Sequence, residues 1–222
     1  SLTRLLKMLV AEEWIRPSDV GARYVAGSRL FELGDDLRSH HPLADLVAPV
    51  VYDLAHETGH SACVAAFQGD HFILLAKTEH RGSYHFIDVF TPNFDWIGNG
   101  MGQLLLAYQP EETVSRIYRE HFEMEVPREH WERFGAIRET GTFVRTEGIV
   151  TRFISAVRAQ GDAAPVENVV SLAALSTHAP DAQAMLAEVC RAARTIEQRF
   201  ELQRVALRPA AEIAPTFQGR RK

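Results

Sequence analysis

The hydrophobic spacing of the first 34 residues constrains the fold most strongly, because it changes from helical to strand-like within a short stretch. The leucines between Leu2 and Leu9 recur every three or four residues, which places them on one face of a helix. Residues 14–16 and 22–25 have the composition of two short strands joined by a turn-rich linker. A helix followed by such a ribbon is typical of the second half of a winged helix-turn-helix.

A winged helix-turn-helix reads DNA with side chains at the start of its second helix, while flanking arginine and lysine side chains bind phosphates. The residues that fit these two roles are Ser1, Thr3, Arg4, Lys7, Arg16 and Arg23. The alternative is a leucine-rich helix that only packs into a core, because the same spacing occurs in helices that contact no nucleic acid. Periodicity alone leaves both interpretations open.

Composition narrows the class of protein. The net charge of −5 gives no overall nucleic-acid signature, so any DNA affinity must come from a local basic patch. The two cysteines, Cys63 and Cys190, are too few and too far apart for a disulfide framework, which indicates a reducing cytoplasm. Cys63 lies in an apolar run and is interpreted as a core residue. The sequence has no signal-peptide pattern and no apolar run of membrane-spanning length, so we expect a cytoplasmic protein without a membrane partner.

The rest of the chain changes repeatedly between helical and strand periods. Helices are predicted at residues 28–38, 43–57, 100–108, 127–134 and 181–202, and another begins at residue 110. Strands are predicted at residues 61–67, 71–77, 84–89, 142–145, 150–157 and 169–175. The end of the chain, from residue 209, is rich in proline and alanine and is expected to be disordered. Antiparallel strands with helices at both ends and inserted midway predict an α+β sensor domain.

One short motif suggests a different chemistry. His56, Glu57 and His60 fit the H-E-x-x-H pattern, in which two histidines on one helical face bind zinc and the glutamate activates water. A zinc hydrolase needs the helix to continue through both histidines and a third ligand. Here Gly59 predicts the end of the helix, which would leave His60 on the connecting turn. Zinc-dependent hydrolysis therefore stays as the alternative function.

The N-terminal motif resembles the IclR family of bacterial transcriptional regulators. In that family the recognition helix ends in R-L-L-x-x-L-x-x-x-G, and the wing closes with Y-x-L-G-x-x-L-x-x-L-G. The matching residues here are Arg4, Leu5, Leu6, Leu9, Tyr24, Gly27, Leu30, Leu33 and Gly34. Glu13 stands where the family usually has glycine. The resemblance continues more loosely to about residue 204.

The resemblance implies a GAF-like (profilin-like) antiparallel sheet flanked by helices, preceded by a partial winged helix-turn-helix and a linker helix. The implied domains are a partial DNA-binding domain at residues 1–27, a linker helix at 28–41, an effector-binding domain at 42–206 and a disordered tail at 207–222. Family members have two more helices before the recognition helix. We therefore expect the chain as given to bind operator DNA weakly or not at all.

The resemblance also places an effector pocket. A glycine-rich loop before a helix can bind an anion through backbone N–H groups, and in the family this loop lines the pocket. The residues carried over to the pocket are Asn99, Gly100, Met101, Phe153, Ser155, Ser176 and His178, with Arg145 where many relatives have aspartate. An arginine binds a carboxylate with two parallel hydrogen bonds, and aromatic groups accept flat rings. We therefore predict a small carboxylate effector, with an aromatic acid among the candidates; Arg145 as a solvated surface charge is the alternative.

Together these features predict a ligand-responsive transcriptional regulator, either a repressor or an activator, that binds DNA as a homodimer, with a tetramer as the alternative. No cofactor, metal or catalytic residue is predicted. A stand-alone small-molecule sensor without DNA binding is the remaining alternative beside the zinc hydrolase.

Overall fold

The computed structural model describes residues 1–21, 23–39, 41–81, 86–158, 166–175 and 181–211. Contacts within the chain divide it into two compact units, Ser1–Asp45 and Leu46–Lys222.

The N-terminal unit is a helix, a ribbon and a second helix. Helix α1 (Leu2–Ala11) is followed by strands β1 (Ile15–Pro17) and β2 (Tyr24–Ala26), which pair antiparallel, and then by α2 (Ser28–Ser39). This order agrees with the helix, ribbon and helix predicted from the sequence, apart from residue 22, which lies outside the described residues. No residue of α1 is buried.

A tight contact closes the base of the ribbon. Glu13 adopts a left-handed conformation with φ of 60°, which is uncommon for a residue with a side chain. Its carboxylate Oε2 accepts a hydrogen bond of 2.6 Å from Ser28 Oγ. A Cβ on Gly27 would lie 1.9 Å from the carbonyl oxygen of Glu13, so only glycine fits there. Glutamate is thus accommodated at the position where the resembling family has glycine.

The second unit is built on one antiparallel sheet. Its strands are β3 (Ser61–Phe67), β4 (Phe72–Thr78), β5 (Thr142–Glu147), β6 (Val150–Val157) and β7 (Asn168–Leu175). They lie in the order β4-β3-β7-β6-β5, and every neighbouring pair is antiparallel. The predicted α+β class is confirmed.

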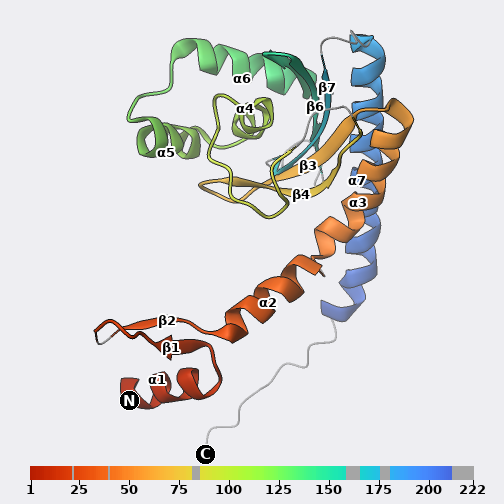
Figure 1. The fold of residues 1–222 in the computed structure, drawn as a ribbon. Helices are drawn as coiled ribbons and strands as arrows, with labels where there is room; N and C mark the ends of the chain where they lie inside the picture. Colours follow the sequence, from red (N-terminus) through yellow and green to blue (C-terminus); the bar gives the residue numbers. More distant parts are fainter. Residues whose placement is uncertain (22, 40, 82–85, 159–165, 176–180, 212–222) are drawn as a thin grey trace, which may run out of the picture. The chain divides into compact units, whose positions relative to one another are not determined.

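Helices cover both faces of this sheet (Figure 1). On one face lie α4 (Gly100–Ala107), α5 (Glu111–Phe122) and α6 (Arg128–Thr140). On the other face lie α3 (Pro42–Thr58) and α7 (Ala182–Ala211). We call these two sides the α4 face and the α7 face. Because side chains alternate along a strand, every strand residue faces one side or the other.

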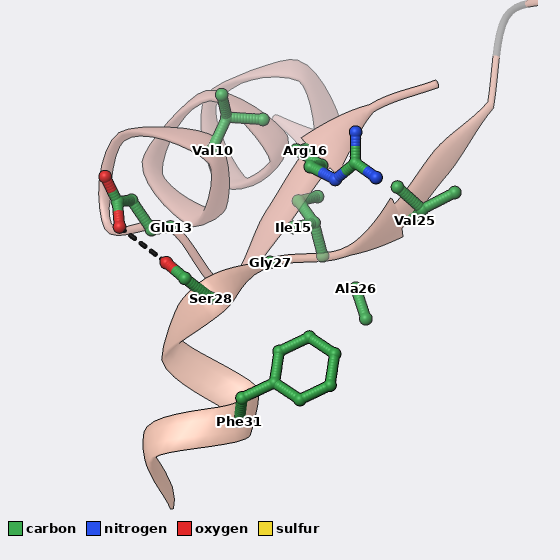
Figure 2. A pocket seen from close by; sticks show the side chains of 9 residues that line it. All are labelled: Val10, Glu13, Ile15, Arg16, Val25, Ala26, Gly27, Ser28 and Phe31. Atoms are coloured by element: carbon green, nitrogen blue, oxygen red, sulfur yellow. Dashed lines mark hydrogen bonds between the residues drawn. The ribbon is translucent and has the colours of Figure 1, made fainter. Parts of the chain in front are cut away.

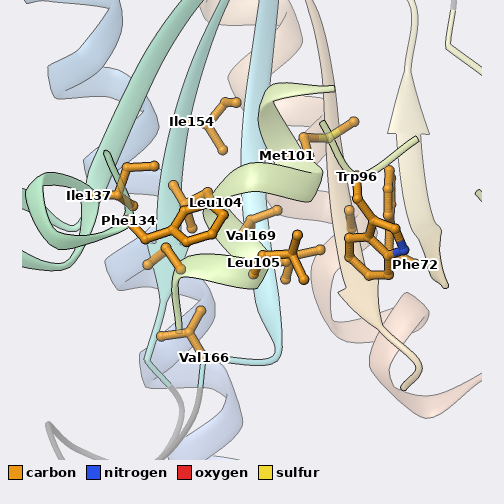
Figure 3. Close-up of a cluster of buried hydrophobic side chains, with 14 of the residues drawn as sticks. Phe72, Trp96, Met101, Leu104, Leu105, Phe134, Ile137, Ile154, Val166 and Val169 are labelled. Carbon is orange, nitrogen blue, oxygen red and sulfur yellow. The ribbon is translucent and has the colours of Figure 1, made fainter. Parts of the chain in front are cut away.

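Helix α4 is buried along its whole length, from Gly100 to Ala107. A helix that is apolar all round is stable only inside a core, and here α4 lies between the sheet and α6. Phe134 of α6 and Ile154 of β6 belong to the same cluster of buried side chains as Leu104 of α4 (Figure 3). The side chain of Asn99 caps the helix by accepting a hydrogen bond from Met101 N at 2.9 Å. Asn99 and the core therefore fix where the first turn of α4 lies.

Three predicted elements differ from the structure. The described part of the predicted strand 84–89, residues 86–89, is not a strand, because side chains satisfy its backbone groups: Phe86 N donates to Glu79 and Phe86 O accepts from Lys77. Helix α6 continues beyond residue 134 to Thr140, where Gly141 in the left-handed conformation ends it. Helix α7 extends to Ala211, so residues 209–211 of the predicted disordered tail are helical. Residues 84, 85 and 212–222 lie outside the described residues.

None of the helices in the described part of the chain combines the length and the apolar character that crossing a membrane requires.

Two glycines inside helices of the second unit test this packing. A Cβ on Gly102 would lie 2.9 Å from the Cα of Trp96, a backbone atom that cannot move aside easily. We expect Gly102→Ala to lower the free energy of unfolding by about 1–3 kcal/mol, because it forces the loop away from α4. The control is Gly135→Ala in α6, where a Cβ meets no atom within 4 Å. It should raise stability by roughly 1 kcal/mol through helix propensity. Urea denaturation measures both, and equal effects would contradict the packing described.

The two cysteines should differ sharply in reactivity. Burial raises the pKa of the Cys63 thiol to about 12, and its Sγ lies 3.5 Å from Met101 Sδ. Cys190 is partly exposed on α7. Because the thiolate is the reactive form, iodoacetamide at about pH 8 should alkylate Cys190 in the native protein and leave Cys63 unmodified until the protein unfolds. Peptide mass spectrometry measures the modification of each cysteine. Rapid labelling of Cys63 in the native protein would contradict this prediction and would show that the α4 face is open to solvent.

Candidate functional site

The predicted DNA-contacting residues are exposed in the N-terminal unit. Ser1, Thr3, Arg4 and Lys7 are exposed at the start and along the length of α1. Arg16 and Arg23 are exposed on the ribbon, where Arg16 lies opposite Val25. In a winged helix-turn-helix, cationic side chains on both the helix and the ribbon contact DNA phosphates. Their contact with DNA remains a prediction.

The N-terminal unit also contains a hollow of about 560 Å³. It lies between α1, the ribbon and the first turn of α2, and Figure 2 shows its lining. The side chains around it are mostly apolar, among them Val10, Ile15, Val25 and Phe31. The polar lining is limited to Arg16 and the hydrogen-bonded pair of Glu13 and Ser28, apart from backbone. This hollow is separate from the predicted effector pocket, which belongs to the second unit.

The glycine-rich loop does bring three predicted effector residues onto the sheet. Asn99 caps α4, and Gly100 and Met101 form its first turn. Met101 Sδ contacts Cys63 Sγ of β3, and a Cβ on Gly100 would lie 2.7 Å from Ile154 Cδ1 of β6. The first turn of α4 therefore lies directly over the middle strands of the sheet.

Arg145 lies on the same face and contacts the loop before α4. Its guanidinium NH1 donates a hydrogen bond of 2.7 Å to the carbonyl oxygen of Ile97. Its Nε lies 3.3 Å from Glu147 Oε1. The alternative of a solvated surface charge does not describe these contacts, because both ends of the guanidinium are held by protein groups.

Two of the predicted wall residues face away from α4. Phe153 and Ser155 alternate along β6 with Ile154 and Ala156, which belong to the core beneath α4. Ser155 instead lines a pocket of about 220 Å³ together with Cys190 and other residues of α7. Phe153 and Ser155 therefore cannot form a wall opposite Asn99. A shift of one residue along a strand exchanges its two faces, so motif matching alone does not fix which β6 residues face α4. Ser176 and His178 lie outside the described residues.

The residues that sequence reasoning missed are Arg152, Glu147 and Ser171. Arg152 lies opposite Arg145 in the β5–β6 pairing and faces α4, almost completely buried. Its Nε donates to Glu147 Oε2 at 3.3 Å, and its guanidinium lies 5.5 Å from the centre of the Phe86 ring. A single charged residue in an otherwise uncharged strand was the available signal, because burying a charge requires a partner.

Further polar groups lie at the β3–β4 side of this face. Lys77 pairs with Cys63 across the two strands and donates hydrogen bonds to Glu79 and Asp88. Burial acts to lower the pKa of Lys77, but the hydrogen bonds to the two carboxylates outweigh it and the pKa is raised. The α4 face thus carries charged groups at both sides of an apolar centre.

The H-E-x-x-H motif does not form a zinc site of the usual geometry. Helix α3 ends at Thr58, and Gly59 follows with φ of 70°, so His60 lies beyond the helix as the sequence predicted. The ring of His56 stacks on Tyr52 with centroids 4.2 Å apart, and Glu57 is paired with Arg191 of α7. Within the described ranges, no group of three or more histidine, cysteine, aspartate or glutamate side chains is placed to hold a metal ion.

Comparison with known proteins places this arrangement among solved structures. No family model and no curated protein matches the chain in sequence. A transcriptional regulator of Rhodococcus sp. has a TM-score of 0.64 at 19% identity, covering 90% of this chain and 84% of that one. IclR of Thermotoga maritima has a TM-score of 0.63 at 17% identity, covering 89% and 83%.

An IclR homologue of Microbacterium hydrocarbonoxydans, solved in complex with 4-hydroxybenzoate, is similar with a TM-score of 0.65 at 16% identity, covering 90% of this chain and 84% of that one. These similarities extend over both the helix–ribbon unit and the sheet unit. The chain therefore has the fold of the IclR-type transcriptional regulators.

Proposed function

We propose that this chain is a ligand-responsive transcriptional regulator of the IclR family, with residues 1–27 contacting DNA and the second unit binding a small effector. The observation that carries the proposal is the presence in one chain of a helix–ribbon unit with exposed cations and a sheet with a buried and a half-buried arginine on its α4 face. The similar solved proteins are transcriptional regulators, which supports the same role. Nothing observed favours a zinc hydrolase over this function, and we propose that the protein is not an enzyme.

The chemistry of the α4 face supports a carboxylate effector. Arg145 and Arg152 lie side by side on neighbouring strands and both face α4. Guanidinium groups bind carboxylates with paired, charge-assisted hydrogen bonds. One similar protein was solved with 4-hydroxybenzoate, which is itself a carboxylate. The site residues that we retain are Asn99, Gly100, Met101 and Arg145, to which we add Arg152.

Regulation requires the two units to be coupled. Binding to two DNA half-sites requires a homodimer, and a tetramer would be a pair of such dimers. The effector must bind with different affinity to two arrangements of the DNA-binding units. We propose that the protein acts in the bacterial cytoplasm as a repressor or activator. A stand-alone sensor would bind the same effector and show no affinity for DNA, so the experiment below separates the two functions.

The arginines of the ribbon should supply phosphate contacts. In a form of the protein that carries the complete winged helix-turn-helix, we expect the double variant Arg16→Ala/Arg23→Ala to weaken binding to DNA from upstream of the protein's own gene. It should also lower the salt dependence of log K by about one per lost contact. Fluorescence anisotropy at several salt concentrations measures both quantities. The control is Arg119→Ala, an exposed arginine of α5. Unchanged affinity and slope in the double variant would contradict the proposed DNA contact.

The effector site should discriminate by charge. We expect calorimetric titration of the whole chain to show binding of small carboxylates such as benzoate, and much weaker binding of the matched neutral amides, because the buried guanidinium of Arg152 favours an anion. Preferential binding of the amides would refute the proposed effector class.

A further inference from the structure

Glu147 holds together three donors from separate parts of the second unit. Its Oε1 accepts a hydrogen bond of 3.1 Å from Gly100 N, at the first turn of α4. The same oxygen lies 3.3 Å from Arg145 Nε, and Oε2 accepts from Arg152 Nε at 3.3 Å. One carboxylate of the chain thus occupies a position between a helix N-terminus and two guanidinium groups.

The position requires an anion whether or not an effector is bound. The side chain of Arg152 is only 4% exposed, and a buried guanidinium is costly without a counter-charge. The N-terminal end of α4 adds the partial positive charge of its unpaired N–H groups. Glu147 therefore supplies the negative charge that Arg152 and the N-terminal end of α4 require. Its carboxylate is the same chemical group as that of the proposed effector.

A buried hydroxyl elsewhere on the α4 face points to a ligand independently. Ser171 is fully buried on β7, and its Oγ has no hydrogen-bond partner among the described residues. In the register of the sheet it lies between Cys63 and Ile154. Those two neighbours contact Met101 and Gly100, so the Ser171 hydroxyl lies beneath the first turn of α4 (Figure 3 shows Met101 and Ile154). A polar group entering there would satisfy a hydroxyl that the protein leaves unsatisfied.

Glu147 lies at a position from which its side chain can move into solvent. It pairs with Val150 at the last position of the β5–β6 ladder, next to a turn formed by Gly148 and the exposed Ile149. Its side chain is 25% exposed, whereas that of Arg152 is nearly enclosed. Rotation of the Glu147 side chain toward solvent breaks no strand pairing, and an entering carboxylate takes over the contacts that Glu147 leaves.

We propose that Glu147 is an internal competitor of the effector: it occupies the carboxylate position in the unliganded protein, and the effector carboxylate displaces it to bind Arg152 and the first turn of α4. Ser171 then contacts a second polar atom of the ligand. This inference rests on the proposed function, since it concerns the effector site of that regulator. It gives the hairpin tip at Glu147 two states, one bound to α4 and one released, which the effector selects.

The decisive variant is Glu147→Gln, titrated with sodium benzoate by calorimetry. The neutral amide competes poorly for two guanidinium groups, so benzoate should bind about tenfold tighter than to the wild type. Glu147→Asp keeps the charge with a shorter reach and should also bind benzoate more tightly than the wild type, which provides a second variant if the glutamine variant folds poorly. Urea denaturation checks the fold of both.

Matched serines on the two faces of the sheet provide the control. Ser171→Ala on the α4 face should weaken the binding of 4-hydroxybenzoate several-fold. Ser155→Ala, the same substitution on the α7 face, should leave it unchanged. Arg152→Met should abolish benzoate binding. Equal effects of the two serine variants, or an affinity in both Glu147 variants no higher than in the wild type, would overturn the inference.

The inference and the proposed function fail separately. If benzoate binding is unaffected by Glu147 while the protein binds DNA through Arg16 and Arg23, the inference is wrong and the regulator stands. If benzoate binds tighter to both Glu147 variants while a form of the protein with the complete winged helix-turn-helix binds no DNA, the displacement mechanism stands and the proposed regulator is wrong.

Discussion

The carboxylate of Glu147 between Arg145, Arg152 and the first turn of α4 is the interaction on which the rest of the second unit depends. It neutralises a buried guanidinium, fixes the N-terminal end of a fully buried helix and joins two strands to that helix. Buried charges are tolerated only when they are paired and hydrogen-bonded. The α4 face therefore combines a well-packed apolar core with one place that must always contain an anion.

The order of the strands creates this place. Strands β6 and β7 lie in the middle of the sheet, so Arg152 and Ser171 are enclosed from both sides. Gly100 permits the close approach of α4, because any side chain there would meet Ile154. Small changes at this turn have consequences for the whole face, since packed interiors do not deform gradually. A ligand that replaces Glu147 therefore alters a contact between sheet and helix rather than a loose surface.

Much of the fold could be predicted from the sequence, and the site only in part. Leucine spacing in α1 and the strand-forming composition of β6 are local patterns, and both elements were predicted correctly. The face of each strand residue depends on register, which the sequence leaves open to a shift of one residue. Phe153 and Ser155 lie on the face opposite to α4. The pairing of Glu147 with Gly100 joins residues far apart in the chain, and no local pattern signals it.

The central claim is that an anion beneath α4 and DNA at the N-terminal unit are coupled. Coupling between two sites is a reciprocal free energy, so a ligand that changes DNA affinity must itself bind with a different affinity when DNA is present. The most direct measurement is the affinity of a form of the protein with the complete winged helix-turn-helix for its upstream DNA, in the absence and presence of saturating 4-hydroxybenzoate. The account predicts a change of about fivefold or more in the dissociation constant. Identical DNA affinity at saturating ligand, with the ligand shown to be bound, would contradict it.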